Sequence, residues 1–236
     1  MPLPIKGDAY AAAIGEVMDA FGAHAKHLVF VGSVVLVLYP PGPGASLPLR
    51  PTKDVDCVST LKPWILQQKI FEELIGRKVI SPDMETSFRY RVRATGTMVD
   101  VLSPERINLG GTTNRWIQEG ARRAGQYTLP DGRSVWALTP PYLLATKLEA
   151  LADRGKDLAT STDLEDIVTL AALIPDLVSQ VEREGIENNL LALAGSIKKS
   201  HPEFFLDELL DIHIHPSVRG ALDRIRTTLS FLWPES

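Results

Sequence analysis

The chain has 236 residues, a formal net charge of −4 and a single cysteine. Its length allows one large or two small domains, and its 44% hydrophobic and 23% charged residues are ordinary for a globular protein. The mild charge excludes a polycation adapted as a whole to nucleic acid, and the lone cysteine excludes an intramolecular disulfide and a multi-cysteine zinc site. Because the sequence shows neither a secretory leader nor an apolar run of about 18 residues, we expect a cytoplasmic protein that contacts no membrane.

The first part of the chain is predicted to mix helices and strands. Helical periodicity covers residues 10–21 and 64–74. Five segments have the β-branched or alternating residues of strands: 28–31, 55–59, 87–92, 97–102 and 126–138. Residues 87–92 and 97–102 are expected to pair through a turn at Thr95-Gly96, and residues 126–138 to form a hairpin of their own. Residues 34–38 fit either a strand or a strand–turn–helix unit, and the prolines and glycines of residues 40–50 predict a loop.

From Thr139 onward the pattern becomes helical. Thr139-Pro140-Pro141 is typical of a helix start, with a capping hydroxyl followed by prolines in the first turn. Four further helical stretches follow: 163–174, 175–183, 186–198 and 216–232. We therefore expect an α+β fold in two domains, with a mixed sheet and flanking helices at 1–138 and a helical bundle at 139–236.

Two carboxylates stand two positions apart at the predicted strand 55–59. Asp54 and Asp56 point to the same face, roughly 6.5–7 Å apart along the strand, whereas Cys57 faces the other side and is expected to be a small buried hydrophobic residue. Like charges so placed repel each other unless a cation lies between them. Asp100 is a third acid on a predicted strand, and Gly32-Ser33 follows a buried one. This pattern predicts a divalent-metal site for phosphate chemistry.

The order of these motifs resembles the nucleotidyltransferase superfamily, which includes DNA polymerase β, CCA-adding enzymes and aminoglycoside nucleotidyltransferases. The resemblance implies that Gly32 and Ser33 open a helix whose N-terminus holds the nucleotide phosphates, since helix N-termini favour anions. It also implies that Asp54, Asp56 and Asp100 are catalytic metal ligands. The interval between Ser33 and Asp54 is longer than is usual in the family, and we attribute this to the Pro-Gly loop, because lengthening a loop costs little free energy.

A second set of residues is similar to AbiEii-type nucleotidyltransferase toxins. The helical segment around Lys147 resembles the Lys-Leu-x-Ala helix of that branch, and Asp163-x-x-Asp166 resembles the Asp-x-x-Asp helix that follows it. The resemblance implies that Lys147 completes the active site and contacts nucleotide phosphate, together with one of the two acids. It makes Arg154 a further nucleotide-binding candidate. Thr162 stands where the branch has an arginine, so the choice between Asp163 and Asp166 stays open.

The resemblance implies a Mg²⁺-dependent nucleotidyltransferase that uses a two-metal site to transfer NMP from an NTP to an acceptor. The acceptor that the family implies is an RNA such as the tRNA 3′ end. The protein is then expected to act as the toxin of a toxin–antitoxin or phage-defence pair, with a cognate antitoxin as partner. Two alternatives stay open: modification of a small molecule, as in aminoglycoside nucleotidyltransferases, and an inactive fold used as a binding module.

Several candidates also have a purely structural interpretation. Asp100 fits a solvated acid on an edge strand, and Asp163 fits a helix-start acid stabilised by the helix dipole. Lys147 fits a surface lysine that snorkels from among leucines. Lys53 is a nucleotide-binding candidate that either balances the charge of the acidic pair, which we favour, or contacts phosphate.

Six arginines are candidates for a nucleic-acid face, although such charge runs are commonly just solvated: Arg89, Arg91, Arg93, Arg115, Arg122 and Arg123. The first three alternate with apolar residues, which predicts a half-exposed strand with a basic outer face. His213 and His215 have no partner at metal-ligand spacing, so we favour a polar strand or turn there over a metal site.

Overall fold

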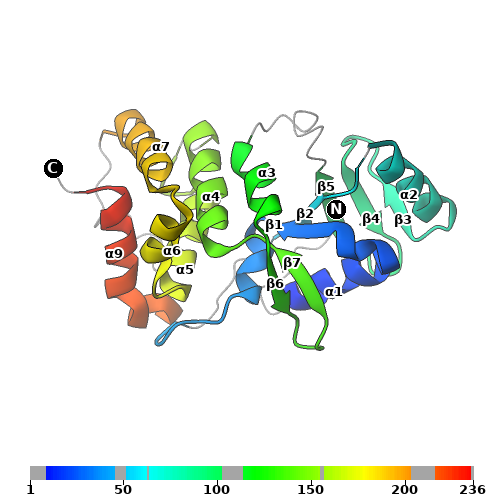
Figure 1. The fold of residues 1–236 in the computed structure, drawn as a ribbon, viewed down its shortest axis with the longest axis horizontal. Coiled ribbons are helices and arrows are strands. Elements are labelled where there is room, and N and C mark those ends of the chain that lie inside the picture. Colours follow the sequence, from blue (N-terminus) through cyan, green and yellow to red (C-terminus); the bar gives the residue numbers. More distant parts are fainter. Residues whose placement is uncertain are drawn as a thin grey trace. The chain divides into compact units, whose positions relative to one another are not determined.

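The computed structural model describes residues 9–45, 52–62, 64–102, 114–154, 157–202 and 216–234. These residues form two compact units. The first unit is drawn from residues 1–38 and 49–139 and contains the β-sheet; the second is drawn from residues 39–48 and 140–236 and is helical (Figure 1). The α+β class expected from the sequence is confirmed.

The first unit is built around a mixed seven-stranded sheet with the order β3-β4-β5-β2-β1-β7-β6. The strands are β1 (Leu28–Val31), β2 (Val55–Ser59), β3 (Ile80–Pro82), β4 (Arg89–Val92), β5 (Met98–Leu102), β6 (Gly125–Thr128) and β7 (Ser134–Ala137). Two pairs are parallel, β2 with β5 and β1 with β7, and the remaining neighbours are antiparallel. The central strand β1 is an apolar run and is entirely buried, and β2 is buried except for the partly exposed Asp56.

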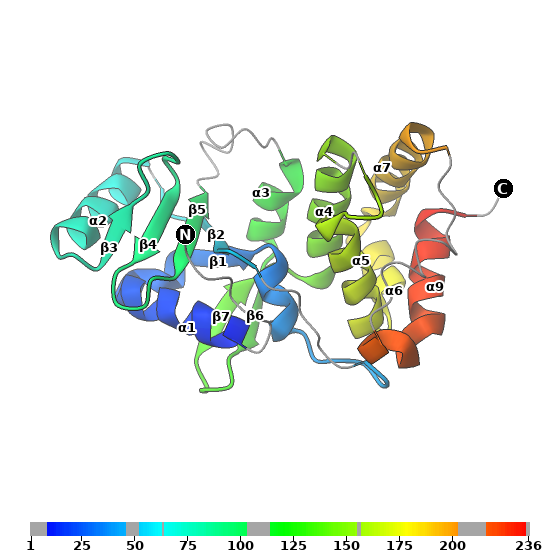
Figure 2. The same ribbon diagram turned by 180° about the vertical axis from the view of Figure 1, so that it is seen from behind.

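The helical segments of this unit are α1 (Tyr10–Phe21), η2 (Gly22–His27), η3 (Ser33–Leu38), α2 (Trp64–Gly76) and α3 (Arg115–Arg122). The apolar stripe of α1 is buried at Ile14, Val17 and Phe21, as its helical period predicts. Phe21 meets the ring of Phe71 of α2 edge-on at 5.8 Å. In both views α2 lies beside β3 and β4 (Figures 1 and 2).

The second unit consists of α4 (Pro140–Arg154), α5 (Thr162–Leu173), α6 (Leu177–Glu184), α7 (Glu187–Ser200), η5 (Pro216–Ala221) and α9 (Leu222–Leu232). Helix α4 packs on α5, α6 and α7, and α9 packs on α5 and α7. Ser161 caps α5, because its side chain accepts a hydrogen bond from the amide of Leu164. Part of the expected Pro-Gly loop joins this unit, since the amide of Gly42 donates to the carbonyl of Leu173 at 2.8 Å.

Most predicted elements are confirmed, and the structure differs from the prediction at a few places. Strand β3 and helix α3 were not predicted, because both are short and their apolar periodicity is weak. Residues 34–38, for which the sequence allowed either a strand or a strand–turn–helix unit, belong to the 3₁₀ segment η3. Among the described residues the buried hydroxyl of Thr139 has no hydrogen-bond partner, so the expected helix cap is wrong. None of the helices in the described part of the chain combines the length and apolar character needed to cross a bilayer.

Candidate functional site

The three acids of the sheet lie on two neighbouring strands. Asp56 of β2 and Asp100 of β5 are Cα partners in the parallel pair, so their side chains lie on the same face. Asp54 directly precedes β2 and shares the face of Asp56. Asp100 is buried, whereas Asp54 and Asp56 are partly exposed. Asp100 is therefore not the solvated edge-strand acid of the alternative interpretation.

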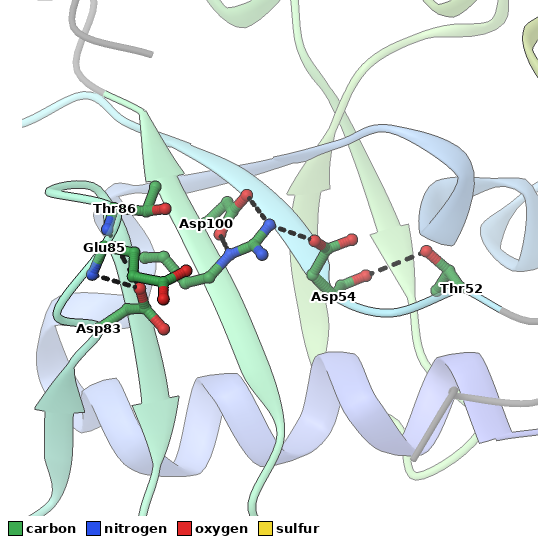
Figure 3. Close-up of polar contacts among 7 residues, drawn as sticks. Thr52, Asp54, Asp83, Glu85, Thr86 and Asp100 are labelled. Carbon is green, nitrogen blue, oxygen red and sulfur yellow. Dashed lines mark hydrogen bonds and ion pairs between the residues drawn. The ribbon is translucent and has the colours of Figure 1, made fainter. Parts of the chain in front are cut away.

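Arg89 joins two of these acids. It is the Cα partner of Asp100 across the antiparallel pair of β4 and β5. Its Nε and Nη2 donate to the two carboxylate oxygens of Asp100, both at 2.7 Å, and Nη2 also donates to Oδ2 of Asp54 at 2.5 Å. Asp54 and Asp100 point toward each other from either side of this guanidinium (Figure 3). The burial of β4 alternates as predicted, with Tyr90 and Val92 buried, but Arg89 on its outer side is paired with these acids and only 32% exposed.

A tight turn positions Arg89 at the start of β4. The carboxylate of Asp83 accepts hydrogen bonds from the amides of Glu85 and Thr86 at 2.9 and 3.0 Å (Figure 3). The backbone of Arg89 closes this turn, since its amide donates to the carbonyl of Thr86 and its carbonyl accepts from the amide of Asp83. Side-chain bonding of an aspartate to following amides stabilises such turns, and here it anchors the backbone of Arg89.

The charges of this cluster shift the pKa values of two neighbours. The hydrogen bond to Asp100 and the charges of Asp100, Asp54 and Asp56 raise the pKa of Arg89 above its ordinary value, against the opposing effect of partial burial. Burial raises the pKa of the Cys57 thiol well above its usual range, and the charges of Asp56 and Asp100 add to this. Cys57 is fully buried, as expected of a small hydrophobic residue.

The donor set of the acidic face suits a hard divalent cation, because Mg²⁺ takes carboxylate oxygens as ligands. Within the described residues, however, no group of three or more acidic, histidine or cysteine side chains is arranged as a ready metal site. The carboxylates of Asp54 and Asp100 are instead directed at Arg89. The chemistry of the residues therefore fits the expected metal, while a guanidinium supplies the neutralising charge.

Gly32 lies against Asp56 at the end of β1. Its φ of +71° is in the region that favours glycine. A Cβ at this position would also lie within 3.1 Å of Cγ and 3.2 Å of Cβ of Asp56, closer than real Cβ contacts normally come. The buried Ser33 follows and opens η3, which is a six-residue 3₁₀ segment rather than a longer helix. Glycine is thus required here by both the backbone and the aspartate beside it.

The other candidates from the sequence lie apart from these contacts or outside the described residues. Lys53 is exposed, beside Asp54 in the chain. The side chain of Arg154 and the pair His213 and His215 lie outside the described residues.

The helical unit holds a second charged cluster. Nζ of Lys147, on α4, lies 2.6 Å from Oδ2 of Asp166 and 3.3 Å from Oδ1 of Asp163, both on α5. The spacing of three residues puts both acids on one face of the helix. All three side chains are at most 10% exposed. Lys147 is therefore not a snorkelling surface lysine, and both acids contact it, Asp166 more closely.

The remaining arginines are outward-facing or paired locally. Arg91 and Arg93 are exposed. On α3, Arg122 and Arg123 form ion pairs with Glu119 at 3.3 and 2.9 Å, and the hydrogen bond from Arg123 lowers the pKa of Glu119. Sequence reasoning missed the role of Arg89. The sequence feature that could have indicated this role is the position of Arg89 on a strand expected to pair with the strand that carries Asp100.

Comparisons with known proteins bear on these residues. No curated protein sequence matches the chain. A crystal structure of an antigenic nucleotidyltransferase-like protein from Paracoccidioides brasiliensis is similar in fold, with a TM-score of 0.52 and 16% identity over 91% of this chain and 98% of the other. Residues 16–213 match the family described as "Nucleotidyl transferase AbiEii toxin, Type IV TA system". The chain thus belongs to the AbiEii nucleotidyltransferase toxin family of type IV toxin–antitoxin systems.

Proposed function

We propose that this protein transfers NMP from an NTP to an RNA acceptor, such as the 3′ end of tRNA, with Mg²⁺ as cofactor. The observation that carries the proposal is the acidic face of the sheet, where Asp56 and Asp100 are neighbours in register and Gly32 packs against Asp56. Carboxylates on adjacent strands beside a glycine-serine step suit the binding of a metal-bound triphosphate. The family membership supports the same reaction class.

In this proposal Asp54, Asp56 and Asp100 hold two Mg²⁺ ions. When bound, these ions neutralise charge on the phosphates and make the acceptor hydroxyl more acidic. Gly32 leaves space beside Asp56 and, with Ser33, presents backbone and hydroxyl groups to the phosphates. Asp100 would act as, or beside, the general base that takes the proton of the acceptor hydroxyl. The hydroxyl oxygen bonds to the α-phosphorus as the bond to the pyrophosphate breaks.

The roles of Lys147, Asp163 and Asp166 in the proposal rest on the family resemblance. Lys147 neutralises charge that develops on the phosphates, and the two acids hold its ammonium in place. The short contacts of Lys147 to both acids support the second part of this statement. The family membership also supports a cognate antitoxin as partner.

The decisive experiment incubates the purified protein with total tRNA and each α-labelled NTP in turn, with and without Mg²⁺. We expect Mg²⁺-dependent label on RNA with one preferred NTP, and loss of at least about a thousandfold in rate for Asp56→Ala, since a metal ligand stabilises the transition state. Asp153→Ala, an exposed acid of α4, is the matched control and should label RNA like the wild type. Full labelling by Asp56→Ala would show that the mechanism is wrong.

One observation favours a second candidate, a binding module without catalysis. The guanidinium of Arg89 already neutralises Asp54 and Asp100 without a metal. This alternative predicts no binding of Mg²⁺–NTP in calorimetry and undiminished toxicity of Asp54→Ala and Asp56→Ala in cells. If the label appeared on a small molecule and none appeared on RNA, the acceptor would be the small molecule instead of RNA.

A further inference from the structure

The contacts of Arg89 occupy the same oxygens that a metal needs. The guanidinium faces both oxygens of Asp100 and one oxygen of Asp54, at 2.5–2.7 Å. A carboxylate that forms bidentate hydrogen bonds with arginine is held in a fixed orientation. The positions of two of the three proposed metal ligands are therefore set by an arginine of a neighbouring strand.

Arginine and a divalent cation compete at such a place. Both are attracted by the same negative charge, and they repel each other strongly at separations of a few ångströms in a partly buried region. The charge on Arg89 is permanent at physiological pH. This repulsion favours withdrawal of the guanidinium from at least one of the two acids when a metal binds to Asp54 and Asp100.

The structure favours such an exchange. Arg89 is 32% exposed and Asp54 21% exposed, so solvent already reaches both the guanidinium and the carboxylate. Its backbone stays fixed in the ladder between β4 and β5, since Arg89 pairs with Asp100 and the neighbouring carbonyl of Phe88 accepts from the amide of Val101 at 2.8 Å. The residue can release the acids without any change in the sheet.

We propose that Arg89 is a positioning residue that serves as the counter-cation of the acidic face without metal and is displaced when a divalent metal binds. The inference rests on the proposed metal site and deepens it. It assigns to Arg89 two effects of opposite sign: the residue stabilises the metal-free fold and weakens metal binding. A guanidinium that stayed in place would also weaken metal binding by charge repulsion, so its displacement is read from the behaviour of its own Nε–H group during metal binding.

The test compares Arg89→Gln with Arg91→Gln, an exposed arginine of the same strand that donates only weakly to the carbonyl of Gly96 at 3.4 Å. Mn²⁺ binding without nucleotide is measured by calorimetry, and Tm is measured in EDTA and in Mn²⁺. For Arg89→Gln we expect a lower Tm in EDTA, at least tenfold tighter Mn²⁺ binding and a larger rise of Tm with Mn²⁺. Arg91→Gln should match the wild type in all three.

The outcomes separate the inference from the proposed function. If the wild type binds Mn²⁺ and Arg89→Gln binds it equally or more weakly, the inference is wrong and the metal site stands. If neither protein binds Mn²⁺, even with NTP present, the proposed metal site is wrong. The inference about Arg89 is then wrong as well, because it rests on that site.

A measurement on the wild type keeps the test decisive if Arg89→Gln does not fold. The Nε–H resonance of Arg89, assigned by its absence in Arg89→Lys, is followed by NMR during a Mg²⁺ titration. We expect it to shift and to exchange faster with solvent as the metal saturates. An unchanged resonance at saturating Mg²⁺ would overturn the inference.

Discussion

The two units of the chain each place one cation between two carboxylates, but in different surroundings. The sheet cluster, Asp54, Arg89 and Asp100, has an arginine that is 32% exposed. The helix cluster, Lys147, Asp163 and Asp166, has no side chain more than 10% exposed. Water and dissolved ions can reach the sheet cluster, whereas the charges of the helix cluster are neutralised mainly by groups of the protein.

Because of this difference, we expect the sheet cluster to exchange its cation more easily and the helix cluster to contribute more to the stability of the fold. A partly exposed ion pair contributes little to folding, because solvent competes with it and screens it. A buried pair is costly to break, because the remaining charge is left without solvation. The sheet cluster is thus suited to a change of cation, and the helix cluster to holding α4 and α5 together.

The largest effect is expected for Lys147→Met, which removes the ammonium that contacts two buried carboxylates. We expect a loss of about 3–5 kcal/mol in the free energy of unfolding. Urea denaturation followed by circular dichroism measures it, with Lys199→Met, an exposed lysine of α7, as control. A loss similar to that of the control would show that burial does not distinguish the two clusters.

Removal of one acid of the helix cluster should cost less than removal of its lysine, because a one-to-one ion pair remains. We expect Asp166→Asn to cost about 1.5–3 kcal/mol, the usual range for a hydrogen bond to a charged group. Asp163→Asn should cost less, because its oxygen lies 3.3 Å from Nζ against 2.6 Å for Asp166. The same denaturation experiment ranks the two variants, and the reverse order would contradict the distances.

For the sheet cluster, Arg89→Gln in EDTA should lower the free energy of unfolding by about 1 kcal/mol, since the pair is partly exposed. High salt should reduce this difference between wild type and variant, because screening weakens exposed pairs. Denaturation at low and high NaCl measures both. A loss as large as that of Lys147→Met would contradict the comparison.

An effect that appears only at alkaline pH concerns Cys57, whose thiol pKa is raised by burial and by Asp56 and Asp100. Its unfolded pKa is about 8.5, so above this pH the unfolded chain loses a proton that the folded protein keeps. The stability is complete below pH 8.5 and falls as pH rises, by at most about 1.4 kcal/mol per unit. The unfolding free energy of the wild type should therefore fall more steeply between pH 8.5 and 9.5 than that of Cys57→Ala. Equal slopes would show that the thiol is not protected.

The confirmed predictions are those that depend on local pattern. The strand containing Cys57 and the helix from Tyr10 to Phe21 follow from apolar periodicity, which burial of one face imposes on any sequence that folds this way. The short strand β3 and the eight-residue helix α3 were missed, because a segment of that length carries too few residues to show a period. The capping role expected for Thr139 failed because a hydroxyl in the right position need not point to an amide.

By itself, the sequence determined the class of fold, the acids that share a face, and the resemblance that the family match confirms. Spacing of two along a strand and three along a helix is a local property, so Asp54 with Asp56 and Asp163 with Asp166 were predictable as pairs. Only the tertiary structure decided that Arg89 contacts Asp54 and Asp100, and that Lys147 contacts both Asp163 and Asp166. Arg89 reaches Asp100 because β4 and β5 pair in one register, and Lys147 reaches Asp166 because α4 packs on α5. Such contacts depend on strand register and helix packing, which no local pattern of residues specifies.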